Sequence, residues 1–158
     1  MMPIHIPAAA LYNACLAGDA AAVSSLVPAG GTPVDLSGPR FQTTGTRSTP
    51  LMQAAWCGHT SIVRMILERA PNTSVDHPDT TRGTALLLAA QFNHADDVRL
   101  LADQGANVNL VGLRGATPLR EAVVGPDPDP DPDGERQVAT VRALLRLGAS
   151  TLPPPPQL

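Results

Sequence analysis

The sequence of 158 residues contains no lysine, and only 3% of its residues are aromatic. Its hydrophobic residues, 43% of the total, are therefore mostly small or aliphatic, which suits closely packed helices better than an enzyme with a large pocket. Two cysteines, Cys15 and Cys57, are too few for a disulfide framework and indicate a reducing compartment. No apolar run approaches the ~18 residues of a membrane span, and no basic segment opens the chain. We therefore expect a soluble protein of the cytoplasm, or alternatively of the nucleus, with no membrane partner.

Outside one acidic segment, the chain also has little net charge. The eleven basic residues are all arginine, fourteen residues are acidic, and the net charge is -3. Five of the acids lie in residues 126–135, a segment that contains no basic residue, so the rest of the chain carries about +2. A field this weak argues against a nucleic-acid partner.

A seven-residue motif recurs along the chain. Residues 49–55 (TPLMQAA) are followed, about 35 and then about 33 residues further on, by 84–90 (TALLLAA) and 117–123 (TPLREAV). A fainter copy without the threonine begins at Leu11. Each copy precedes a second apolar stretch that ends at a helix breaker. These stretches are residues 23–27, 62–67, 98–101 and 141–145.

The motif carries the signals of a helix. The threonines at its first position should cap helix N-termini, because a hydroxyl can accept a hydrogen bond from an otherwise unpaired backbone N–H. These threonines are Thr49, Thr84 and Thr117. The first helix of each unit should end at Gly18, Gly58 or Asn93, since Gly and Asn tolerate the left-handed conformation. One helix pair cannot bury its apolar face alone, so we predict an all-α solenoid of about four helix–turn–helix units.

These motifs resemble the ankyrin repeat. The likeness is fullest in the third unit, where residues 84–90 are followed by Asn93-His94, by 98–101 (VRLL) and by 105–109 (GANVN). It implies one ankyrin-repeat domain over residues 1–152, with a degenerate first unit and a fourth unit interrupted by an acidic loop. The units are approximately 8–36, 45–76, 79–109 and 112–150, with a finger insertion at 37–48, an acidic Pro/Asp loop at 126–135 and a Pro-rich tail at 153–158.

The resemblance implies that the end of each first helix lines a concave groove that binds partner proteins. Trp56-Cys57 and Gln91-Phe92 occupy these positions in adjacent units. Aromatic anchors dominate protein interfaces, so we predict partner contact there, the alternative being that the aromatics fold under a neighbouring finger and pack. The polar rim of the surface would be formed by the finger-tip residues Arg47, Thr80, Thr81, Arg82, Leu113 and Arg114.

Three further patterns have simple interpretations. His59 and His94 lie one repeat apart, ~8–10 Å, with no other ligands, so they should hydrogen-bond within their turns rather than bind zinc. Residues 129–134 resemble the opening of a calcium loop, but the twelfth position is Thr140 rather than the required Glu. Asp96 and Asp97 begin a helix, where negative charge suits the helix dipole.

No nucleophile–base pair or Gly-rich phosphate loop is recognisable in the sequence. We therefore predict a protein–protein interaction module that is not an enzyme, acts as a monomer, and needs no cofactor, metal or small-molecule substrate. The protein partner is not identified by the sequence. Two alternatives remain: a segment that recruits substrates or partners to a larger enzyme or ligase complex, and a calcium-responsive module acting through residues 126–135.

Overall fold

A computed structural model describes residues 8–27, 48–70, 74–79, 82–126 and 134–150. In these ranges the chain forms eight α-helices and one short 3-10 helix, with no strand. The helices are α1 (Ala8–Ala17), α2 (Ala20–Leu26), α3 (Pro50–Cys57), α4 (Thr60–Arg69), α5 (Ala85–Gln91), α6 (Ala95–Asp103), α7 (Pro118–Val124) and α8 (Glu135–Arg146), with η1 (Leu113–Gly115) before α7. The predicted all-α fold is therefore confirmed.

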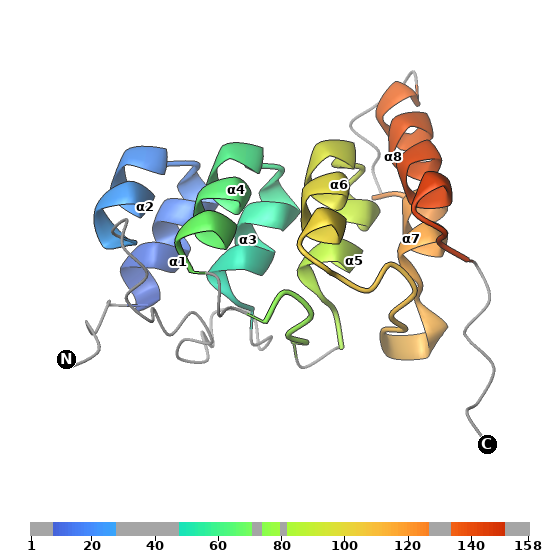
Figure 1. Cartoon of the computed structure of the whole chain (residues 1–158), viewed down its shortest axis with the longest axis horizontal. Coiled ribbons are helices and arrows are strands. Elements are labelled where there is room, and N and C mark those ends of the chain that lie inside the picture. Colours follow the sequence, from blue (N-terminus) through green and yellow to red (C-terminus); the bar gives the residue numbers. More distant parts are fainter. Residues whose placement is uncertain (1–7, 28–47, 71–73, 80–81, 127–133, 151–158) are drawn as a thin grey trace.

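The helices stand in two parallel rows, as Figure 1 shows. The first helices of the units, α1, α3, α5 and α7, pack in sequence along one row, and α2, α4, α6 and α8 along the other. Each helix pair therefore stacks on the next pair, as expected for a solenoid. Most of the predicted finger insertion, most of the acidic loop and the whole Pro-rich tail lie outside the described residues, as do Arg47, Thr80 and Thr81. The single domain over residues 1–152 stays a prediction.

The predicted threonine caps are present. In each case the side-chain oxygen accepts a hydrogen bond from the backbone N–H three residues further on, at 3.2 to 3.3 Å. At Thr49 the cap is reciprocal, because its own N–H donates to the Met52 sulfur at 3.4 Å. The alanine pairs that follow, including Ala54 and Ala55, are fully buried between neighbouring first helices. Small side chains thus allow the close packing that the composition predicted.

Glycine and histidine join the first three units. Gly18 and Gly58 have φ values of +72° and +74°, and a Cβ on either would lie only 2.8 or 2.5 Å from the imidazole of His59 or His94. The missing side chain at Gly58 leaves room for His94 to cross the junction and bond the Trp56 carbonyl, at 3.1 Å. The prediction that His94 bonds within its own turn is therefore wrong, because its partner lies in the preceding unit.

Side chains and backbone also join the units on the side of the second helices and the fingers. The carboxylate of Asp76 accepts two hydrogen bonds, at 3.0 and 3.1 Å, from the backbone N–H of Asn107. Asn109 then donates to the Gly148 carbonyl at 3.1 Å and accepts from the Ser150 N–H at 2.7 Å. Units two, three and four are thus connected in a chain of hydrogen bonds.

Among the described residues no helix is long and apolar enough to cross a membrane.

Arg69 links the second unit to the first. Its Nη1 donates to the Ser24 hydroxyl at 2.9 Å and to the carbonyls of Ser24 and Val27 at 3.1 and 2.8 Å, which closes the C-terminal end of α2. Replacing Arg69 by Ala should lower the free energy of unfolding by about 2 kcal/mol, because partly buried carbonyls lose a charged donor. Urea denaturation followed by far-UV circular dichroism measures the change.

Arg64 supplies the matched control for that variant. It lies on the same helix, is exposed, and makes no hydrogen bond or ion pair with the rest of the described chain. Its replacement by Ala should change the free energy of unfolding by less than about 0.5 kcal/mol. Equal losses for the two variants would contradict a specific bridging role for Arg69.

Candidate functional site

Trp56 and Phe92 form one aromatic pair at the far end of the first helices. Trp56 lies in the last turn of α3, and Phe92 is the residue that follows α5. Their ring centroids are 5.6 Å apart and the rings stand at 83°, an edge-to-face arrangement. Trp56 nevertheless keeps 40% of its surface exposed, whereas Phe92 is half-buried. The two predicted anchors therefore pack against each other and still present an indole face to solvent.

Trp56 belongs to a row of equivalent positions. Counting from the leucine of each repeated motif, the same position is occupied by Leu16, Trp56, Gln91 and Val124. Leu16 and Val124 are 45% and 68% exposed, and their helices lie in the row formed by α1, α3, α5 and α7. The sequence interpretation missed both residues. Aligning the four units on that leucine would have found them.

Cys57 sits beside this row. It is half-buried, accepts a hydrogen bond from Gln53 at 3.5 Å, and its sulfur lies 3.9 Å from the Leu16 carbonyl. Burial raises the pKa of the Cys15 thiol to about 12, and the electrostatic influence of Cys57 adds a smaller part of this shift. Cys15 therefore stays protonated and inert at neutral pH. These contacts place the Cys57 thiol at the junction of the first two units.

The finger tips present the other described members of the predicted surface. Arg82, Leu113 and Arg114 are exposed, with Leu113 and Arg114 in the turn η1. The turn is held by a hydrogen bond of 2.8 Å from the Gly112 N–H to the Ala116 carbonyl. Fingers precede the first helices, whereas the aromatic pair lies at their C-terminal ends. The structure thus places the two groups at opposite ends of helices that are ~10–12 Å long rather than in one cluster.

The acidic start of α6 contains two residues with different surroundings. Asp96 is exposed and pairs with Arg99 at 2.7 Å. Asp97 is fully buried, and neither of its oxygens has a hydrogen-bond partner of good geometry among the described residues. Burial raises the pKa of Asp97 to about 6, and Asp96 adds to the shift, whereas Thr60 and His59 oppose it. Asp97 lies in the first turn of α6, as the sequence indicated, but its burial there disfavours the charged carboxylate.

Polar side chains gather at the start of α6 and α8. Arg136 donates to the Phe92 carbonyl at 3.3 Å and lies 3.3 Å from the His94 ring. Burial lowers the pKa of His94. The charges of Arg136 and His59 lower it further, whereas the bond to the Trp56 carbonyl opposes the shift.

Among the described residues no three His, Cys, Asp or Glu side chains are placed to hold a metal ion. The calcium-like segment, residues 129–134, lies outside the described ranges except for Gly134.

Comparison with known families supports the repeat assignment. A family model described as "Ankyrin repeat" matches residues 46–80 and residues 83–113. The first match contains α3 and α4, and the second contains α5, α6 and the tip of the following finger. No curated protein matches the sequence.

Proposed function

Because residues 46–80 and 83–113 are ankyrin repeats, we propose that this chain binds a partner protein along its row of first helices. Ankyrin repeats are in general non-catalytic protein-interaction modules, and solenoids use extended concave surfaces for binding. The observation that carries the proposal is the Trp56–Phe92 pair, which presents an exposed indole in the middle of the row. Arg82, Leu113 and Arg114 would contact the partner at the finger end of the same helices.

The aromatic pair has the properties of a binding hot spot. Trp is enriched among residues whose truncation costs about 2 kcal/mol or more of binding free energy. Edge-to-face packing on Phe92 fixes the indole before a partner arrives, so less side-chain entropy is lost on binding. Leu16 and Val124 extend the apolar surface to both sides. The partner should therefore offer apolar side chains to the row and polar groups to the finger tips.

The proposal is tested by capture with an aromatic-deficient variant. The full chain and the Trp56→Ala/Phe92→Ala variant are immobilised and exposed to lysate of the native cell, and bound proteins are quantified by mass spectrometry. We expect proteins captured by the wild type to fall about ten-fold or more on the variant, because the central anchor is lost. Far-UV circular dichroism must show unchanged helical content for the comparison to count, and Trp56→Gln alone serves if the double variant unfolds.

Arg64→Ala is the control for this capture. Arg64 is exposed on α4, away from the row of first helices. Its truncation should leave the amount of captured protein unchanged. Undiminished capture by the aromatic-deficient variants would reject the proposed site.

A further inference from the structure

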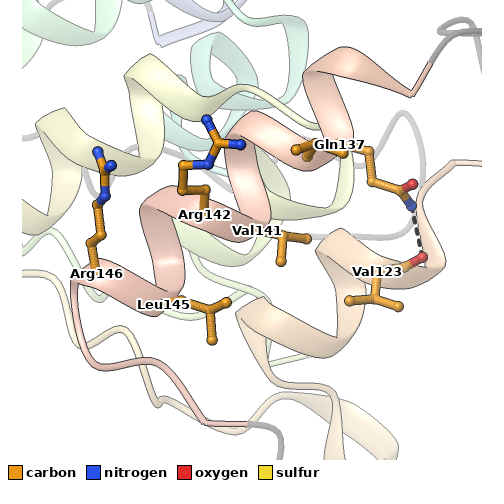
Figure 2. A pocket seen from close by; sticks show the side chains of 7 residues that line it. Val123, Gln137, Val141, Arg142, Leu145 and Arg146 are labelled. Atoms are coloured by element: carbon orange, nitrogen blue, oxygen red, sulfur yellow. Dashed lines mark hydrogen bonds between the residues drawn. The ribbon is translucent and has the colours of Figure 1, made fainter.

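A second apolar surface lies at the end of the stack formed by α7 and α8. It is a groove of about 530 Å³ lined by aliphatic side chains, with arginines at one edge. Figure 2 shows Val141 and Leu145 of α8 on the same side as Val123 of α7, while Arg142 and Arg146 extend along the other side of α8. Gln137 connects the two helices by donating to the Val123 carbonyl at 2.8 Å.

Equivalent positions in the inner units are covered by the next helix pair. Ala55 and Ala90 are fully buried there, whereas Val123 at the same position of the fourth unit is 56% exposed. Leu67 of α4 is 7% exposed, and its counterpart Leu145 is 57% exposed. The groove is therefore the surface on which a further helix would stack, and it is more apolar at Val123 than the alanines of the inner units.

Among the described residues, the charged side chains that line the groove are both arginine. Arg142 and Arg146 lie one helical turn apart at the edge of the groove, and neither makes a hydrogen bond or ion pair with another described residue. No acidic residue lines the groove among the described residues. Two copies of the chain joined through this face would bring four guanidinium groups together, which costs binding free energy. A partner with carboxylates on the facing edge would instead gain favourable binding free energy from the arginines.

We propose that this end face binds an acidic amphipathic α-helix of a partner protein. Its aliphatic side chains would cover Val123, Val138 and Leu145, and its carboxylates would pair with Arg142 and Arg146. A helix is the expected occupant because helices cover the equivalent positions in units two and three, at the ~8–10 Å spacing of packed helices. The surface is separate from Trp56 and Phe92, so the chain would hold two partners, or two parts of one partner.

The test uses a pair of synthetic helical peptides that differ only in charge. Both carry leucines at positions i, i+3, i+4 and i+7, one with glutamates along a flank and the other with lysines. Fluorescence anisotropy of the dye-labelled peptides measures binding to the full chain. We expect the glutamate peptide to bind about ten-fold or more tightly than the lysine peptide. Arg142→Glu/Arg146→Glu should reverse that order, and Leu145→Gln should weaken binding of the glutamate peptide.

The controls separate this proposal from the one above. Trp56→Ala/Phe92→Ala should bind the glutamate peptide as the wild type does, so the two surfaces can fail independently. Far-UV circular dichroism and thermal melting of the α8 variants check that the fold is retained. Absent binding, equal affinity for both peptides, or an unchanged preference after charge reversal would overturn the proposal. So would a dimer seen by light scattering that Leu145→Gln dissociates, because a second copy would then cover the face.

Discussion

Replacing Asp97 by Asn should stabilise the protein by about 3 kcal/mol at pH 7 and have little effect near pH 4. The folded state holds the pKa of Asp97 at about 6, whereas the ordinary value is 3.8. The folded protein therefore binds the proton more tightly, and the stability associated with the neutral acid is lost as the pH rises from about 4 to about 6. Asn remains neutral across this range and avoids the cost of ionising a buried carboxyl. That cost grows by about 1.4 kcal/mol per pH unit between the two pKa values.

The measurement is urea denaturation of both proteins at several pH values. Taking the difference between variant and wild type removes the contributions of the other carboxylates, which the two proteins share. Asp96→Asn is the control, because Asp96 is exposed and its replacement only removes the surface pair with Arg99. That variant should be unchanged or slightly destabilised. A difference between Asp97→Asn and wild type that does not vary with pH would show that Asp97 is not held protonated by burial.

Replacing Gly58 by Ala should destabilise the protein by about 3 kcal/mol. The left-handed backbone at φ +74° costs an alanine roughly 1 kcal/mol. Its Cβ would also lie 2.5 Å from the His94 ring, which must then move and lose its bond to the Trp56 carbonyl, adding about 2 kcal/mol. The midpoint and slope of urea denaturation give the total loss.

Gly105 allows the two contributions to be separated. Its φ is +89°, but no atom of the described chain lies within 4 Å of the position that a Cβ would take, so Gly105→Ala should cost only the backbone strain of about 1 kcal/mol. In a double-mutant cycle, His94→Ala should cost much less in the Gly58→Ala background than in the wild type, because the ring is already displaced. Equal losses at Gly58 and Gly105 would show that the close approach of His94 contributes nothing.

Local signals were sufficient to predict the helices. The threonine caps, the alanine pairs and the glycines act within a few residues of their own position, so a repeated motif specifies a repeated structure. Thr49 accepts the expected hydrogen bond, and Gly58 ends α3 in the left-handed conformation. The exposure of Trp56 was expected from the resemblance to the ankyrin repeat, which places the end of each first helix on the concave groove.

Contacts between units were harder to predict. Asp96 and Asp97 are neighbours of the same type in sequence, and only the packing of α6 against α4 and α8 decides that one is exposed and the other buried. His94 reaches the preceding unit because Gly58, 36 residues earlier in the sequence, lacks a side chain. Leu145 looks like an ordinary core leucine in the sequence, and only the stack shows that no helix of the described chain covers it.

The regular spacing of the first helices also determines which spacing of apolar side chains in a partner can match the row. Leu16, Trp56, Gln91 and Val124 recur once per unit, and packed helices are spaced by ~8–10 Å. A ligand in extended conformation advances ~3.3 Å per residue, so every third side chain would come into register with the row. A helical ligand advances ~1.5 Å per residue and would match the row about every fifth to seventh residue. Candidate binding sequences can thus be ranked by the period of their apolar residues before any of them is measured.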